Sequence, residues 1–246
     1  YAMVRSFLQP QLGPPLPPEE RAASLRQALR ELLVGVIPAA VLIFATLGSI
    51  LAGVATPTEA AAVGAAAALV LTLLYRKLTL TSLKEATLST LQISSLILLL
   101  VVGSNFYGAV FARLGTATWI TQGLLSMSLP PAAMLWLIML IIYILGWPLE
   151  WPAIILIFVP FFLPVVDQLG IDPLWFGILV AVNLQTAFLS PPVAMAAYYL
   201  KAVAPEMEML DIYKGMLQFM VLQLAGLLII FFFPDIVLWL PRVLFG

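Results

Sequence analysis

The sequence contains no cysteine and no histidine, and only 9% of its 246 residues are charged. Without cysteine the chain has no disulfide and no thiolate nucleophile, and without histidine it lacks imidazole bases and most transition-metal sites. It also contains no Gly-x-Ser-x-Gly motif and no paired aspartates within an apolar run. These absences argue against an enzyme and against a resident cofactor.

The residues that are present are mainly apolar, at 63% hydrophobic with a mean hydropathy of +1.11. So few charges could not cover the surface of a water-soluble domain. The net charge of −1, with scattered basic residues, gives no nucleic-acid surface. The composition therefore predicts a polytopic membrane protein, all-α in fold class, that lies in a lipid bilayer.

A polar, proline-rich stretch over residues 9–20 resembles an inter-domain linker. We therefore assign residues 1–31 to a cytoplasmic linker and the start of an arm helix, and residues 32–246 to a transmembrane domain. Because the sequence starts at Tyr1 rather than at a methionine, we expect it to lack the N-terminal part of a longer protein.

Capping motifs predict where the first helices begin. Ser24 and Gln27 fit the start of a helix whose membrane span covers residues 33–53. Thr56, Pro57, Thr58 and Glu59 form a second capping motif, which precedes a small-residue helix over 60–75. The further expected elements are a short interfacial helix from Ser82 to Glu85 onward, an amphipathic segment at 116–128, a loop or interfacial helix at 205–213, and spans at 93–112 and 215–233.

The apolar run over residues 135–166 is too long for one span. About thirty residues make a helix of about 45 Å, against a hydrocarbon core of about 30 Å. Pro148 and Pro152 divide the run into two arms of about fifteen residues each. This pattern predicts a re-entrant helical hairpin whose tip lies at residues 146–152.

The next apolar run, over residues 173–204, is also interrupted. Ser190, Pro191 and Pro192 break it near its middle, just after Asn183, Gln185 and Thr186. Irregular backbone survives at membrane depth only where protein or a water-filled cavity satisfies its polar groups. Two breaks in succession therefore indicate a site.

The second break has the chemistry of a sodium site. Sodium prefers oxygen ligands, which Asn183, Thr186, Ser190 and unwound backbone carbonyls supply without a permanent charge. The free N–H groups of a broken helix suit a carboxylate. The alternatives are that the polar side chains only bond neighbouring helices and that the prolines only bend the helix.

Three other polar residues have competing interpretations. Glu150 is the only carboxylate in the hairpin. An ionised side chain at mid-membrane costs about 2.5–3.5 kcal/mol. Glu150 therefore either faces water or a partner in the site, or caps the start of a helix. For Glu59 we favour capping over a role in the site. For Asn105 we favour a bond between two helices over a place in a cavity.

Lysine and arginine in short loops favour the cytoplasm. With Arg26, Arg30, Arg76, Lys77 and Lys84 inside, a re-entrant hairpin also places Lys201 and Lys214 inside, whereas Arg113 and Arg242 fall outside. A full crossing of the membrane over residues 135–166 would instead place Lys201 and Lys214 outside. The charge pattern therefore supports re-entrance.

Four motifs in order, at residues 53–62, 146–154, 170–178 and 183–193, resemble the large membrane subunit of tripartite ATP-independent periplasmic (TRAP) transporters. The resemblance covers nearly the whole chain from Leu33 onward. Residues 183–193 together with 196–201 look most like the subgroup labelled mannitol or chloroaromatic compound transporters.

The resemblance implies an elevator-type secondary transporter of the bacterial inner membrane, built from inverted repeats and driven by a sodium gradient. It implies an organic-acid substrate delivered by a periplasmic binding protein, and a small membrane subunit as partner. Only the second repeat has a counterpart in this sequence. The family's ion and substrate sites would fall at Gly146, Leu149, Glu150, Trp151, Pro152, Asn183, Gln185, Thr186, Ser190, Pro191, Pro192 and Val193.

Two other functions remain open. One is a sodium/carboxylate carrier that works without a binding protein, and the other is a membrane scaffold that does not transport. The tip sequence from Trp147 to Pro152 differs from that of many family members, which have other apolar residues there.

Overall fold

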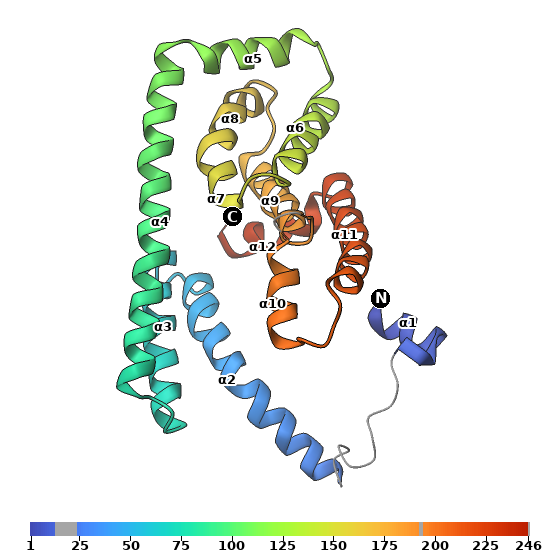
Figure 1. Cartoon of the computed structure of the whole chain (residues 1–246). Coiled ribbons are helices and arrows are strands. Elements are labelled where there is room, and N and C mark those ends of the chain that lie inside the picture. Colours follow the sequence, from blue (N-terminus) through green and yellow to red (C-terminus); the bar gives the residue numbers. More distant parts are fainter. Residues whose placement is uncertain (13–23, 192–193, 246) are drawn as a thin grey trace. The chain divides into compact units, whose positions relative to one another are not determined.

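The computed structural model describes residues 1–12, 24–191 and 194–245, and every regular element in these ranges is helical (Figure 1). This confirms the all-α prediction. Among the described residues, five helical segments are long and apolar enough to cross a membrane: Leu25–Leu51, Pro57–Leu74, Leu80–Phe111, Trp151–Gln168 and Met209–Phe232. The chain forms two compact units, Tyr1–Glu85 and Ala86–Gly246.

The first unit contains α1 (Ala2–Leu8), the 3-10 helix η1 (Pro10–Leu12), α2 (Leu25–Leu51) and α3 (Pro57–Leu74). The end of the predicted linker lies outside the described residues. As expected, Ser24 caps α2, and its side chain accepts a hydrogen bond from the Gln27 N–H at 3.2 Å. The helix therefore starts well before the apolar span at residue 33.

The capping motif at the start of α3 is confirmed in both directions. The Thr56 N–H donates to the Glu59 carboxylate at 2.8 Å, and the Glu59 N–H donates to the Thr56 hydroxyl at 3.4 Å. Pro57 occupies the first helical position, where its missing N–H is harmless. The Glu59 carboxylate thus has a local partner.

Helices α2 and α3 approach closely at Gly64. A Cβ atom at this position would lie 2.5 Å from Cγ2 of Thr46 on α2. Small residues allow membrane helices to come this close, because packing between backbones stabilises their association in lipid.

Helix α4 (Leu80–Arg113) corrects the prediction of a short interfacial helix followed by a separate span. It is one continuous helix of 34 residues. No proline or glycine lies between residues 80 and 102, so nothing in the sequence interrupts it. Its start is fixed by Thr79 and Ser82, which exchange backbone-to-side-chain hydrogen bonds of 3.0 Å.

A helical hairpin follows α5 (Thr116–Ser126). Its first arm is α6 (Pro131–Leu145), and its second arm consists of α7 (Trp151–Ala153), the π-helix η3 (Ile154–Phe158) and α8 (Val159–Gln168). Helix α8 packs against α5, so the chain returns to the side from which it came (Figure 1). The second arm has 18 residues rather than about fifteen, long enough to span about 27 Å. Re-entrance into the membrane stays a prediction.

The broken helix consists of α9 (Pro173–Leu184), the 3-10 helix η4 (Gln185–Phe188) and α10 (Met195–Val203). Asp172 caps α9, and its carboxylate accepts hydrogen bonds from the N–H groups of Leu174 and Trp175. Regular α-helix stops at Leu184 and resumes at Met195, which confirms the predicted interruption. The predicted site residues Pro192 and Val193 lie outside the described residues.

Helix α11 (Met209–Phe232) begins six residues earlier than the span predicted from Gly215, so the predicted loop at 205–213 is shorter than expected. It is followed by α12 (Asp235–Phe245), in which Arg242 pairs with Asp235 at 2.7 Å. Helix α9 packs against α6, α8, α11 and α12. The broken helix is therefore central to the second unit.

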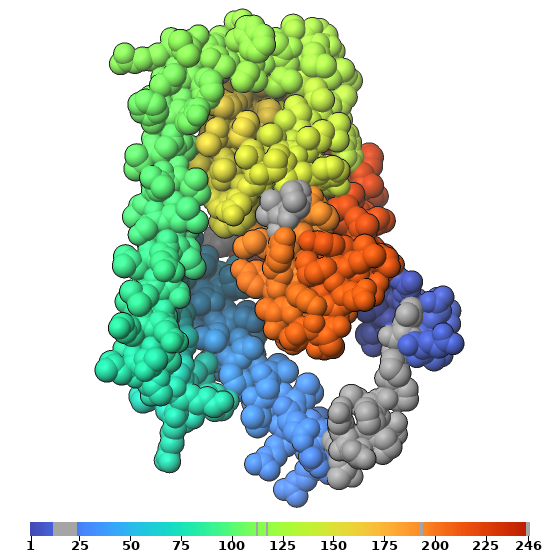
Figure 2. Space-filling view, in the orientation of Figure 1, coloured from blue at the N-terminus to red at the C-terminus, as the bar shows by residue number. Residues whose placement is uncertain are grey.

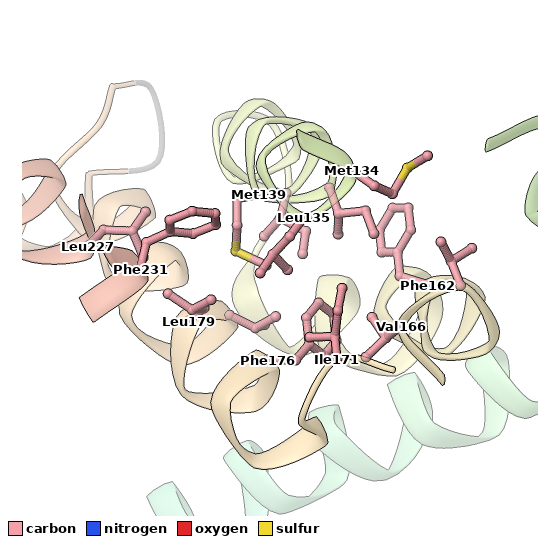
Figure 3. Close-up of a cluster of buried hydrophobic side chains, with 14 of the residues drawn as sticks. Met134, Leu135, Met139, Phe162, Val166, Ile171, Phe176, Leu179, Leu227 and Phe231 are labelled. Carbon is pink, nitrogen blue, oxygen red and sulfur yellow. The ribbon is translucent and has the colours of Figure 1, made fainter. Parts of the chain in front are cut away.

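The core of the second unit lies where α6, α8, α9 and α11 meet (Figure 3). Its members include Met134 and Leu135 from α6, Phe162 from α8, Phe176 from α9 and Phe231 from α11, all buried. This packing fixes the hairpin against the broken helix.

Candidate functional site

The hairpin tip and the helix break lie against each other. A Cβ atom at Gly146 would lie 3.3 Å from the Cβ atom of Ala187 in η4. A pocket of about 50 Å³ joins the two segments and is lined by Leu149, Glu150, Trp151, Ala187, Phe188 and Met195. Figure 2 shows the yellow hairpin in contact with the orange broken helix. The two predicted interruptions are thus neighbours in space and share a pocket.

Asn183 is the most buried polar residue of the break, with 1% of its surface exposed. Its Nδ2 donates to the Met139 carbonyl of α6 at 2.7 Å, which ties the broken helix to the hairpin. Its Oδ1 atom is also buried, and within the described residues it has no hydrogen-bond partner.

Thr186 and Ser190, which follow Asn183 in the sequence, are also buried, each with 2% of its surface exposed. The Thr186 hydroxyl donates to the Asn183 carbonyl at 2.6 Å and so keeps its oxygen lone pairs free to accept. The Ser190 Oγ atom is buried without a hydrogen-bond partner among the described residues. An unpaired buried polar atom costs about 1–3 kcal/mol, so two of them in one break call for a partner such as a water or an ion.

Gln185 has a different environment from these three residues. Its side chain is exposed and accepts a hydrogen bond from Gln223 Nε2 of α11 at 3.1 Å. The same Nε2 atom lies 3.3 Å from the Val182 carbonyl. Gln185 therefore connects the break to α11.

At the tip, Glu150 is exposed and lines the pocket, and its side chain forms no capping hydrogen bond to α7. Trp151 is 44% exposed, Pro152 and Leu149 are half-buried, and Pro191 is exposed at the turn after Ser190. A carboxylate beside apolar side chains makes the pocket attractive to cations and repulsive to anions.

Three contributors to the site escaped the sequence analysis: Met139, Gln223 and Ser104. Ser104 of α4 is buried, and its hydroxyl donates to the Leu156 carbonyl in the second arm. Asn105, which we expected to bond two helices, is exposed instead. The prediction for Asn105 indicated the right turn of α4, but only the direction of each side chain decides which residue reaches the hairpin.

Comparison with known proteins identifies the family. The model of the tripartite ATP-independent periplasmic transporter, DctM component, matches residues 11–236. The chain belongs to the DctM family. It is 34% identical to the sialic acid TRAP transporter large permease of Vibrio cholerae, a match that covers 92% of this chain and 51% of the relative. It is 32% identical to the C4-dicarboxylate TRAP transporter large permease of Rhodobacter capsulatus, again covering 92% of this chain and 51% of the relative.

Membership of the DctM family confirms a transporter family rather than an enzyme family, and a multi-pass protein of the bacterial inner membrane. The chain spans about half the length of the curated relatives described above. These relatives are named for sialic acid and C4-dicarboxylates, and another is named for isethionate. These names do not support the mannitol or chloroaromatic subgroup.

Proposed function

We propose that this chain forms the second repeat of a TRAP transporter large permease that couples a sodium gradient to the uptake of an organic acid. In this proposal a periplasmic binding protein delivers the substrate and a small membrane subunit completes the transporter. The hairpin and the broken helix move together as part of an elevator-type carrier, and the hairpin is re-entrant.

The observation that supports this function best is the pair of buried, unpaired oxygen atoms, Asn183 Oδ1 and Ser190 Oγ. Both belong to uncharged side chains and lie on either side of a 3-10 turn in a broken helix. A sodium ion would satisfy such oxygens together with backbone carbonyls. Asn, Thr and Ser do not titrate near neutral pH, so these residues suit a metal cation better than a proton.

The pocket at the hairpin tip supports a place for the apolar part of the substrate next to the ion site, since the Glu150 carboxylate disfavours an anionic group there. It joins the two interruptions, and its lining is mostly apolar, as expected for the side chains around a small organic ligand. Its volume of about 50 Å³ would hold only part of such a molecule. The family's first repeat would supply the other half of the site.

The test is the thermal stability of the complete large subunit with its small partner, in sodium and in choline at equal ionic strength. A ligand that binds only the folded state raises the unfolding free energy by RT ln(1 + [L]/Kd). We expect a sodium-specific increase that Asn183→Ala and Ser190→Ala reduce. Thr121→Val, at a buried hydroxyl in α5, is the matched control and should keep the increase.

Sodium-dependent uptake by the same variants is the second test of the ion site. If both variants keep full sodium stimulation, the ion site lies elsewhere. If sodium and choline give equal stability and equal uptake in the parent protein, sodium coupling is wrong, and a proton-coupled carrier or a scaffold explains the fold better.

A further inference from the structure

The second arm of the hairpin has a gap in its own backbone hydrogen bonds. In an α-helix the N–H of residue 160 would donate to the carbonyl of Leu156, four positions earlier. Residue 160 is a proline and has no N–H to donate. The preceding residue, Val159, donates five positions back to Ile154, which is the π-helical pattern of η3. In this register residue 160 would reach the carbonyl of Ile155, so Pro160 supplies a donor to neither Ile155 nor Leu156.

A side chain from another helix supplies the missing donor. The Ser104 hydroxyl of α4 donates to the Leu156 carbonyl, 52 positions away in the sequence. Ser104 is only 8% exposed, so this donor is largely shielded from water. Two helical turns further along α4, the Phe111 ring meets the Phe161 ring edge-on, with centroids 5.5 Å apart.

We propose that Ser104 is a positioning residue for the hairpin, and that it replaces the backbone donor that Pro160 removes. The bond fixes the second arm against α4 about 9 Å, or six residues, from Glu150 at the tip. It therefore sets how the tip lies against Ala187 and the break. The consequence for sodium-coupled transport rests on the proposed function, whereas the placement of the tip does not.

The proline explains why this contact is more than a general helix–helix bond. A donor from α4 has a role here because the arm has no N–H of its own at residue 160, next to the π-helical turn. The substitution Pro160→Ala would restore an N–H within the arm and make the Ser104 hydroxyl dispensable. The two residues should therefore show strong coupling in a double-mutant cycle.

The experiment uses the complete large subunit with its small partner and a single reporter cysteine, Trp147→Cys, at the exposed tip. This chain has no cysteine of its own, so any in the remaining sequence would be replaced by serine. The variants are Ser104→Ala, Pro160→Ala, the pair together, and the conservative Ser104→Thr. The controls are Ser94→Ala, at an exposed position on α4, and the pair Ser104→Ala with Pro164→Ala, which removes the other proline of α8.

We expect Ser104→Ala to change the maleimide labelling rate at the tip by about threefold, the factor for one interhelical hydrogen bond in a membrane protein. Adding Pro160→Ala should return the rate to the parent value, whereas adding Pro164→Ala should not. Ser104→Thr should label like the parent. In the uptake assay, Ser104→Ala should shift the sodium concentration for half-maximal uptake, and Pro160→Ala should reverse that shift.

Several results would overturn the proposal. One is a Ser104→Ala variant that labels at the parent rate, and another is rescue by Pro164→Ala as effective as rescue by Pro160→Ala. A variant with a lower Tm but unchanged labelling would show a bond that only stabilises the fold. If the parent protein shows no sodium dependence, the proposed function fails, but the labelling cycle still tests the position of the tip.

Discussion

The two units of this chain differ in where some of their polar side chains bond. In the first unit the hydroxyls of Thr46, Ser49 and Thr72 donate to carbonyls of their own helices. In the second unit the side chains of Asn183 and Trp175 donate to carbonyls of other helices, Met139 at 2.7 Å and Ile230 at 3.2 Å. Polar side chains that bond within their own helix leave its surface apolar, whereas polar side chains that bond to other helices hold those helices together around a core.

Burial follows the same division. Among the described residues of the first unit only Ala60 is buried, whereas the second unit has a core from four helices and buried polar residues at the break. Lipid tails are as apolar as leucine, so the apolar surfaces of α2 and α3 are suited to a bilayer. The candidate site lies in the unit whose helices pack against one another.

The largest effect should come from removing the cross-helix amide of the break. Asn183→Leu keeps similar volume but removes both the bond to Met139 and the free oxygen. At sodium concentrations near 100 times Kd, the parent should gain about 2.7 kcal/mol of stability from the ion. We expect the variant to lose this gain, measured as the difference in unfolding between sodium and choline. If Asn183→Leu kept the sodium-specific increase in stability, the Asn183 side chain would not be a ligand of the ion.

In the first unit the close approach of α2 and α3 can be tested by adding a larger side chain at Gly64. Gly64→Leu would force side-chain atoms into the space held by Thr46, and overpacking of this kind costs about 1–3 kcal/mol. Gly35→Leu on α2 is the control, since a Cβ atom there meets nothing within 4 Å. Thermal unfolding in detergent should show a loss for Gly64→Leu only. Equal effects would mean that helix propensity rather than close approach governs this pair.

The pocket should discriminate ligands by charge. With Met195→Cys as a reporter in the pocket, a cationic thiol reagent should react faster than an anionic one of similar size, because Glu150 lines the same pocket. Two unit charges 6 Å apart in water interact by about 0.7 kcal/mol, or about threefold for each sign and tenfold for the ratio. Glu150→Gln should bring the ratio close to that of the free reagents. A ratio that does not respond to Glu150→Gln would place the carboxylate away from the pocket.

Features that depend on neighbouring residues could be predicted from the sequence. The caps at Ser24 and Thr56 and the interruptions near Pro152 and Pro191 follow from local chemistry, and the structure has them at the predicted places. The continuity of α4 differs from the prediction because the change from an amphipathic segment after Ser82 to an apolar span at 93 indicates a change of surroundings, not the end of a helix.

The partners of the site could not be predicted, because they depend on which helices meet. Met139 offers a backbone carbonyl, which any residue has, so no pattern in the sequence marks it. Ser104 and Asn105 are adjacent and equally polar, and only the rotation of α4 decides which of them faces Leu156. The breaks were thus visible in the sequence, while the contacts that hold them together were not.

The smallest effect should come from the link between the break and α11. Gln223→Leu removes the hydrogen bonds to Gln185 and to the Val182 carbonyl. Gln185 is exposed, so we expect a loss near the average of about 0.6 kcal/mol for interhelical bonds in a membrane protein, and no change in the sodium-specific part. Gln92→Leu, at an exposed position on α4, is the control, and unfolding in sodium and in choline is the measurement. If Gln223→Leu reduced the sodium-specific gain as much as Asn183→Leu, the pair of Gln185 and Gln223 would belong to the ion site, and burial would not be what distinguishes ion ligands from residues that only link helices in this unit.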